Sequence, residues 1–291
     1  MAHTNTAIDD FQAVSPFQEL AAYEALWAQT DASVKTVAAQ FRHGKTYLPS
    51  ELLSSQNIQV YIEKLREKFK SHYPFEICLA TEVDFPKKIL EATHPIPFLY
   101  YKGNWDLIYS PAVAVVGTRQ PTQEGLARTQ KLTKLLVEQD FTIVSGLAKG
   151  IDTCAHHTAI EAGGNTIAVI GTPITECYPK ENQALQDKIA QSHLLVSQVP
   201  FFKYMQQDFR LNRFFFPERN KTMSAISLAT VIIEAGETSG TLVQAREALR
   251  QGRKLFILDN CFHNTALTWP ARFEKQGAIR VKAFSDILRH L

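Results

Sequence analysis

The chain has 291 residues, of which 45% are hydrophobic, and its formal net charge at pH 7 is +2. This composition is too apolar for a disordered chain, and the length allows one large domain or two modest ones. The balanced charge excludes a polycation, so any nucleic-acid site has to be a local patch of basic side chains.

Nothing in the sequence predicts membrane insertion or export. No run of about eighteen apolar residues occurs, so no transmembrane helix is expected. The first residues, Met1 to Thr6, carry neither a basic region nor an apolar block, so we expect no signal peptide and a cytoplasmic protein. The four cysteines are Cys78, Cys154, Cys177 and Cys261. They lie far apart in the sequence, so we expect free thiols and no zinc site. We also expect no other metal and no cofactor.

The first 72 residues predict a small α-helical domain. Residues 1 to about 14 look frayed, and Ser15-Pro16 followed by Glu19 fits a helix N-cap with proline at the first helical position. Apolar stripes then predict helices that end near Trp27, His43 and Lys70. The sequence His72-Tyr73-Pro74 marks the boundary, so a second domain is expected over residues 73–291.

The second domain is organised around a predicted strand–helix–strand unit. Residues 112–116 are an apolar run without polar alternation, which is typical of a strand buried on both faces. The run stops at Gly117, a helical pattern follows, and a second strand over residues 141–145 stops at Gly146. This is a βαβ unit, whose crossover should be right-handed.

The same pattern recurs along the chain. Residues 166–170 end at Gly171 and residues 229–235 end at Gly236, and further strands are predicted at 75–79, 98–103, 194–197, 254–258 and 279–281. These elements predict an α/β fold with a doubly wound, mainly parallel sheet. Ligands bind such sheets outside the carboxyl ends of the strands, so the loops that follow the four glycines should line one site. The alternative is that these glycines merely end strands.

A basic and aromatic segment lies between residues 203 and 221. Its basic residues are Lys203, Arg210, Arg213, Arg219 and Lys221, opposed by Asp208 and Glu218, so five positive and two negative charges give a local +3. Aromatic residues are interleaved: Tyr204, Phe209, Phe214, Phe215 and Phe216. Such a mixture suits a single-stranded nucleic acid, whereas the alternative is a solvated charge run beside core aromatics.

The helix predicted after Gly150 carries Asp152, Cys154 and His156. Residues this close on one helix do not readily adopt nucleophile–base geometry without a third orienting group, so we expect no catalytic residues. We expect instead that backbone amides at the start of this helix receive an anion, with Asp152 as the cap.

Taken together, five motifs resemble the DNA-processing protein A family, DprA or Smf, from about Tyr73 to the end of the chain. They are Val116-Gly117-Thr118-Arg119, the run Ser145-Gly146-Leu147-Ala148-x-Gly150-Ile151-Asp152-x-x-Ala155-His156, Tyr178-Pro179-x-x-Asn182, Phe216-Pro217-x-Arg219-Asn220, and Glu234-Ala235-x-x-x-Ser239-Gly240-Thr241-Leu242. The resemblance implies an extended Rossmann fold in a cytoplasmic homodimer. It also implies a protein that binds single-stranded DNA and hands it to the RecA recombinase, in recombination or in the natural transformation of competent cells.

Several positions depart from the family pattern. Thr118 stands where the family usually has serine, Lys221 where it has arginine, and Ala225 where it has glycine. Residues 199–205 replace a loop rich in proline and glycine, and the chain ends at Leu291 without a winged-helix domain. We therefore expect a divergent member of the family.

The motifs define the candidate DNA- and phosphate-binding residues, which are Gly117, Thr118, Arg119, Gly146, Lys149, Gly150, Asp152, Arg219, Asn220, Lys221, Ser239, Gly240 and Thr241. We expect the cations among them to form one electrostatic groove for single-stranded DNA. The alternative for Arg219 is a buried ion pair, for example with Glu234.

Two other functions use the same fold. The chain is similar in fold to LOG-type nucleotide phosphoribohydrolases, whose signature ends in Gly-Thr-x-x-Glu, but here the run ends in Gln244. Glutamine does not ionise and cannot replace that carboxylate, which argues against hydrolysis. A sensor of small nucleotides is the other alternative, because loops that bind anions do not distinguish a mononucleotide from a DNA phosphate. The sequence therefore favours a binding protein without turnover.

Overall fold

The described residues form a nine-stranded sheet with the strand order β1-β2-β6-β5-β4-β3-β7-β8-β9. The computed structural model describes residues 14–70 and 72–291. The strands are β1 (Glu76–Leu79), β2 (Phe98–Gly103), β3 (Ala112–Val116), β4 (Thr142–Ser145), β5 (Thr166–Ile170), β6 (Leu194–Ser197), β7 (Ala229–Ile232), β8 (Lys254–Leu258) and β9 (Ile279–Val281). All neighbours from β6 to β9 pair in parallel, and β2 pairs antiparallel with both β1 and β6. The predicted α/β fold with a mainly parallel sheet is confirmed.

Strand β3 is buried on both faces. Val113 and Val115 pack into one apolar cluster with Leu132 and Leu136 of the next helix. The alternate residues Ala112, Ala114 and Val116 pack into a second cluster on the other face. Two covered faces explain why the sequence of this strand shows no polar alternation.

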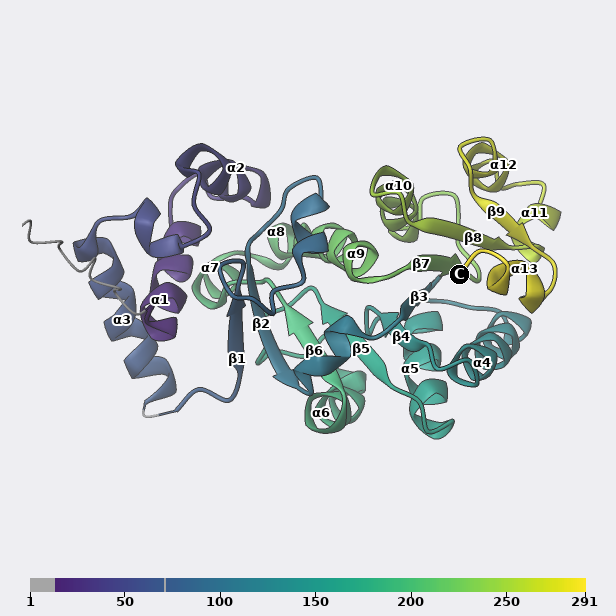
Figure 1. Ribbon diagram of the computed structural model, residues 1–291, viewed down its shortest axis with the longest axis horizontal. Coiled ribbons are helices and arrows are strands. Elements are labelled where there is room, and N and C mark those ends of the chain that lie inside the picture. Colours follow the sequence, from purple (N-terminus) through teal and green to yellow (C-terminus); the bar gives the residue numbers. More distant parts are fainter. Residues whose placement is uncertain (1–13, 71) are drawn as a thin grey trace, which may run out of the picture.

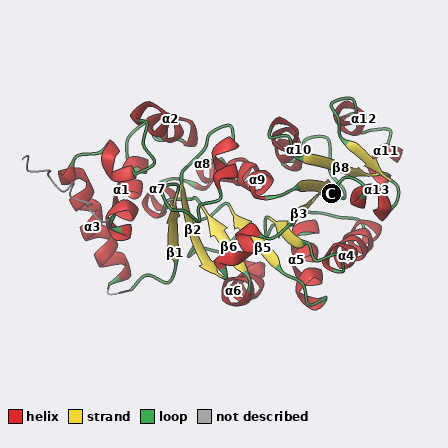
Figure 2. Ribbon diagram, in the orientation of Figure 1, coloured by secondary structure: helices red, strands yellow, loops and turns green. Residues whose placement is uncertain are grey.

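Helices cover both faces of the sheet (Figures 1 and 2). On one face lie α4 (Gln123–Val137), α5 (Ile151–Glu161) and α6 (Gln183–Ser192); on the other lie α9 (Phe215–Ile226), α10 (Thr241–Arg250) and α12 (Trp269–Glu274). Shorter helices occupy the connections: α7 (Phe201–Gln206), α8 (Phe209–Asn212), α11 (Asn260–His263) and α13 (Phe284–Leu288), with 3-10 helices at η1 (Pro49–Leu52), η2 (Lys87–Glu91), η3 (Trp105–Tyr109) and η4 (Lys180–Asn182).

Three helices precede the sheet and lie beyond its β1 edge (Figure 1): α1 (Pro16–Trp27), α2 (Val34–Gly44) and α3 (Ser55–Phe69). Helix α1 begins as predicted, since Ser15 is its N-cap and accepts a hydrogen bond from the Gln18 amide at 3.4 Å. Residues 1–13, on which the predictions of a frayed start and of no signal peptide depend, lie outside the described residues. The division between residues 72 and 73 stays a prediction and falls in the connection from α3 to β1.

Helix α1 packs directly on the sheet. The ring of Tyr23 stacks on that of Phe98 in β2, with ring centroids 4.1 Å apart. Trp27 at the end of α1 contacts Phe215 at the start of α9, at 5.6 Å between centroids. All four residues belong to one cluster of buried side chains, so the N-terminal helices and the sheet share a core.

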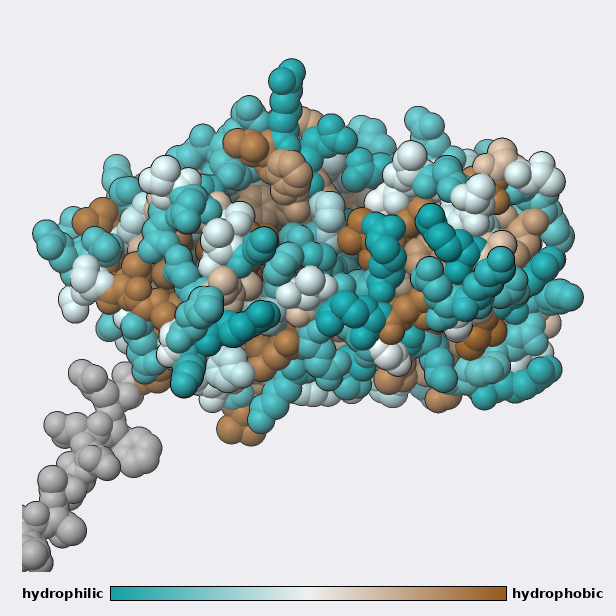
Figure 3. Space-filling view, turned by 90° about the horizontal axis from the view of Figure 1, so that it is seen from above, coloured by the Kyte–Doolittle hydropathy of each residue, from teal (hydrophilic) through white to brown (hydrophobic). Residues whose placement is uncertain are grey.

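In the described part of the chain, no helix combines the length and the apolar character needed to span a bilayer. Seen from above, hydrophobic residues appear in separate patches among hydrophilic ones (Figure 3). Exposed large apolar side chains are concentrated in the segment of α7 and α8, where Met205, Phe209, Leu211 and Phe214 are between 48% and 70% exposed.

Candidate nucleic-acid interface

A groove of about 640 Å3 lies at the carboxyl edge of the parallel strands. The loops after β3 and β7 line it, together with the start of α5 and one side of α9. Nine of the predicted site residues contribute to its lining: Gly117, Thr118, Arg119, Asp152, Arg219, Asn220, Ser239, Gly240 and Thr241. Because parallel strands end at the same edge, motifs far apart in the sequence meet here.

Short polar contacts hold the floor of the groove together. The Thr241 hydroxyl donates to the carbonyl of Gly117 at 3.2 Å, which joins the loop after β7 to the end of β3. The Asn220 amide donates to the carbonyl of Gly240 at 3.1 Å, which joins α9 to the same loop. The Ser239 hydroxyl accepts from the Thr241 amide at 3.2 Å. These polar side chains therefore order the loops that carry the exposed groups.

Arg219 lies beneath the groove and is 8% exposed. Its guanidinium donates to the backbone carbonyls of Gly146 and Val169, and its Nε donates to the Asn220 side chain at 2.9 Å. A Cβ atom added to Gly146 would lie 2.5 Å from this guanidinium, so the close approach requires glycine. Gly146 and Arg219 are thus a matched pair that joins α9 to the ends of β4 and β5.

Asp152 supplies the buried negative charge near Arg219. It is 6% exposed and accepts from the Gly146 amide at 3.2 Å. Burial raises the pKa of Asp152, and the positive charge of Arg219 opposes this shift. Burial lowers the pKa of Arg219 to about 10, with Asp152 opposing that shift, so the guanidinium stays charged at neutral pH. The alternative partner, Glu234, instead accepts from the amide and hydroxyl of Thr122.

The predicted capping role of Asp152 is wrong. The N-cap of α5 is Gly150, which has a φ of +80°, and Asp152 is the second residue of the helix. The amides of Ile151 and Thr153 already donate to backbone carbonyls, at 3.2 and 3.1 Å. These two donors are used within the protein, so they are not offered to an anion. That other amides at the start of α5 receive an anion stays a prediction.

Two exposed arginines face the groove without an ion-pair partner among the described residues. Arg119 follows β3, and its guanidinium lies 5.9 Å from the centroid of the Phe216 ring. Arg213 precedes α9 and lines the same groove. Lys149 lines a smaller adjoining cavity of about 40 Å3 together with Arg119, and its ammonium pairs with Glu181 at 2.7 Å. The exposed positive charge of the groove therefore comes mainly from arginine.

Aromatic side chains form one wall of the groove. The ring of Tyr178 lies 5.6 Å from that of Phe216 and 6.0 Å from that of Phe209. Tyr178 is 39% exposed and Phe209 is 56% exposed. The ring of Phe216 lies against Gly171, where an added Cβ would come within 2.6 Å of it. The sequence drew attention to Phe209 and Phe216, but the only signal for Tyr178 was its place in the Tyr-Pro motif.

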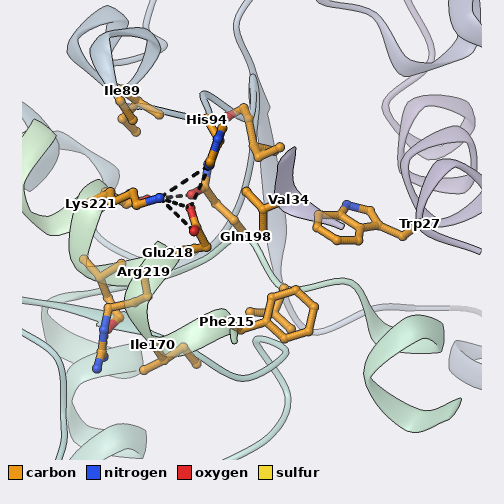
Figure 4. A pocket seen from close by; sticks show the side chains of 15 residues that line it. Trp27, Val34, Ile89, His94, Ile170, Gln198, Phe215, Glu218, Arg219 and Lys221 are labelled. Carbon is orange, nitrogen blue, oxygen red and sulfur yellow. Dashed lines mark hydrogen bonds and ion pairs between the residues drawn. The ribbon is translucent and has the colours of Figure 1, made fainter. Parts of the chain in front are cut away.

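Lys221 does not reach this groove, which corrects the prediction. Its ammonium lies 2.7 and 2.8 Å from the Glu218 carboxylate oxygens and 3.4 Å from His94 Nδ1 (Figure 4). These side chains line a separate cavity of about 30 Å3, which Trp27 of α1 also lines. Arg219 also lines this cavity, but its guanidinium points away from the Lys221 ammonium (Figure 4), because residues two apart on a helix do not face the same side.

Cys154 and His156 have different partners. The Cys154 thiol is 3.8 Å from the carbonyl of Leu126, and His156 Nδ1 is 2.7 Å from the Thr166 hydroxyl. Burial lowers the pKa of His156 to about 3, so its ring is neutral at physiological pH. The pair does not form a nucleophile and its base.

One group of side chains outside the groove could hold a cation. Donor atoms of Cys78, Glu82 and Asp84 lie within 4.8 Å of one another in the connection after β1. Burial raises the pKa of Cys78, and the two carboxylates raise it further. The thiol is therefore protonated, and these residues are far from the groove in the fold, beyond β2, β6, β5 and β4.

Comparison with known proteins places this chain in a family. The sequence model described as DNA recombination-mediator protein A matches residues 76–291. The DNA processing protein DprA of Streptococcus pneumoniae is 37% identical over 228 residues, which cover 78% of this chain and 76% of that protein. The DprA of Bacillus subtilis is 34% identical, over 68% of this chain and 65% of that protein. Protein Smf of Synechocystis is 39% identical, over 61% of this chain and 44% of that protein, so the chain spans less than two thirds of these last two relatives.

Solved structures of members of this family superpose on the chain. The X-ray structure of the Streptococcus pneumoniae DprA superposes with a TM-score of 0.77 at 27% identity and covers 96% of this chain and 98% of that one. A structure of the Helicobacter pylori protein, described as giving insight into its single-stranded DNA binding mode, superposes with a TM-score of 0.63 at 28% identity over 76% of this chain and 97% of that one.

Proposed function

Because the chain belongs to the DNA recombination-mediator protein A family, we propose that it binds single-stranded DNA in the groove at the carboxyl edge of its sheet. The relatives it matches are named as DNA processing proteins, and the Helicobacter pylori relative is described as binding single-stranded DNA. These names support a role in DNA processing.

The observation that carries the proposal is that exposed arginines and accessible aromatic rings line the same groove. Arg119 and Arg213 face the same space as Tyr178, Phe209 and Phe216. Aromatic rings stack on bases with little sequence preference, and arginines neutralise phosphates. Bases of a duplex are already paired and stacked on each other, so these rings favour a single strand.

Arg219, which lies beneath the groove, would favour DNA binding through its charge. Its charge is buried, its Nη1 already donates to the carbonyls of Gly146 and Val169, and its Nε donates to Asn220, so we expect it to contribute mainly a positive potential. Asp152 offsets part of this potential. The exposed Arg119 is therefore the residue that we expect to contact phosphate.

The proposal extends to the cellular role that the family resemblance implies. The protein would act without turnover in the cytoplasm, as a homodimer, and pass bound single-stranded DNA to the RecA recombinase during recombination or natural transformation. Thr118, Ser239, Gly240 and Thr241 would take part through the loops that they order at the floor of the groove.

A small nucleotide is the second candidate ligand, because a groove of about 640 Å3 is within the usual size range of small-molecule sites. Hydrolysis of that nucleotide is not supported. Gln244 lines the groove where the hydrolase signature has a carboxylate, is fully buried, and donates to the Thr230 hydroxyl at 3.2 Å. An amide held in this way does not act as an acid or base.

Parallel titrations separate these functions. Fluorescence anisotropy would follow binding to single- and double-stranded oligonucleotides of equal length at two salt concentrations, beside a panel of nucleotides with analysis of products. We expect the protein to bind the single strand more tightly than the duplex, and to bind it more weakly at the higher salt concentration. The oligonucleotide should be recovered intact. Tighter binding of a mononucleotide, or release of a base, would replace the proposal with one of the alternatives.

A further inference from the structure

A carboxylate of α1 is buried against the start of α7. Glu24 is fully buried and accepts hydrogen bonds from the amides of Phe201 and Phe202, at 2.8 and 3.0 Å, and from the Tyr100 hydroxyl at 2.7 Å. Burial raises the pKa of Glu24 to about 7, and the bond from Tyr100, those from the two amides and the charge of Lys68 oppose the shift. A buried carboxyl group with these donors fixes the geometry around it.

The helix held by Glu24 begins the segment that supplies the aromatic wall of the groove. The first amides of a helix have no partner within that helix, and the cap of α7 is Pro200, which makes no side-chain bond to them. Glu24 therefore satisfies the start of α7 from another element. Eight residues after Phe201 the same segment brings Phe209 to the groove, followed by Arg213 and Phe216.

The far end of this segment also contacts α1. Phe215 is 7% exposed and packs against Trp27, whereas its neighbour Phe216 contacts Tyr178 in the groove. Successive residues of a helix point in directions about 100° apart, so one ring is held by α1 while the next faces the groove. Helix α3 adds a contact between Phe69 and Phe201, at 5.3 Å between ring centroids.

We propose that the N-terminal helices position the base-stacking wall of the groove, with Glu24 and Trp27 as positioning residues that act through α7 and Phe215. The inference rests on the proposed function and gives the helices before the sheet a part in it. DNA would not touch Glu24, and its effect on binding would come from the order that it imposes on residues 201–216.

The chain offers a matched control on the same helix. Glu19 of α1 is 3% exposed, and its carboxylate accepts from the amide and the hydroxyl of Ser50, at 2.9 and 2.5 Å. Ser50 belongs to η1, within the N-terminal helices. Glu19→Gln therefore disturbs a buried carboxylate of α1 without disturbing α7.

The test compares Glu24→Gln with Glu19→Gln in the full chain. Amide hydrogen exchange of the free protein reports the order of residues 201–216, and anisotropy of a labelled oligothymidine reports binding. We expect Glu24→Gln to increase exchange in residues 201–216 and to weaken binding about fivefold, because weakened hydrogen bonds release the start of α7. Glu19→Gln should change neither quantity more than about twofold.

If the two variants behave alike in exchange and in binding, the inference is overturned. If the wild-type protein does not bind oligothymidine, the proposed function fails, while the exchange measurement still decides whether Glu24 orders the segment.

If Glu24→Gln does not fold, Trp27→Leu replaces it, with Phe41→Leu of α2 as its control. Phe41 is 4% exposed in the same cluster, and its ring pairs with no ring of residues 201–216 in the described part of the chain. Increased exchange at 213–216 in Trp27→Leu alone is the expected result, and equal exchange in both contradicts the inference.

Discussion

Arg119 and Lys221 are both basic residues of the predicted site, but their surroundings differ. Arg119 is exposed in the groove, whereas the Lys221 side chain is 13% exposed and paired with Glu218. We expect Arg119→Ala to weaken binding of single-stranded DNA and to reduce the slope of log affinity against log salt by about 0.7, since one phosphate contact is lost. Its melting temperature should not change, because no ion pair is removed.

Lys221→Ala is the control for this measurement. It should leave the affinity and the salt slope unchanged, because its ammonium lies in another cavity. Titrations across a salt series, with thermal melting of both variants, give all the quantities needed. An Arg119→Ala protein with wild-type affinity and slope would exclude Arg119 as a phosphate ligand.

Part of the difference between the surroundings of Arg119 and Lys221 was predictable from the sequence. The place of Arg119 follows from the strand that ends at Gly117, because a residue there has to lie at the carboxyl edge of the sheet. The helical spacing of Arg219 and Lys221 already argues against a shared surface, and the Glu218–Lys221 pair has the three-residue spacing of helix ion pairs. The approach of His94 to Lys221 depends on packing across 127 positions, which periodicity does not encode.

At the level of elements, Arg219 joins α9 to β4 and β5. Replacing it with alanine leaves the carbonyls of Gly146 and Val169 without this donor and removes the larger of the two arginine charges that act on the buried Asp152. We expect Arg219→Ala to lower the free energy of unfolding by about 3–5 kcal/mol, measured by denaturant unfolding.

Arg219→Lys is the conservative comparison. It keeps the charge but not the planar guanidinium, whose Nη1 donates to two carbonyls while its Nε donates to Asn220, so its stability should be intermediate. An Arg219→Ala protein with wild-type stability but lost DNA binding would contradict the structural role and make Arg219 a direct ligand.

The nine strands of the described residues overlap the predicted runs, because continuous apolar runs followed by glycine or a polar turn carry a strong local signal. The run predicted over residues 229–235 is longer than strand β7, which ends at Ile232. The roles within residues 201–216 were not predictable in the same way. Phe201 and Phe215 are buried, whereas Phe209 and Phe214 are exposed. Which of these rings is buried depends on contacts with α1. The hydrogen bond from the Phe201 amide to Glu24 spans 177 positions of the sequence.

At the level of the molecule, the two parts predicted on either side of residue 72 share one buried cluster, which includes Leu20, Leu26, Tyr100 and Ile170. We infer that this shared cluster lets the N-terminal helices order the segment of residues 201–216. The net charge of +2 gives no strong overall field, so under the proposed function we expect the local arginines of the groove to attract DNA. Because of the shared cluster and the low net charge, we expect DNA binding to depend on the geometry of the groove.

The most direct test of this account is to locate bound DNA by photocrosslinking. An oligothymidine with 5-iododeoxyuridine at successive positions would be irradiated in complex with the protein, and the crosslinked residues identified by mass spectrometry. We predict crosslinks at the aromatic wall, on Tyr178, Phe209 or Phe216, because bases stack on these rings. Crosslinks confined to another surface, such as the groove between α4 and β9 that Leu135 and Phe284 line, would contradict the account.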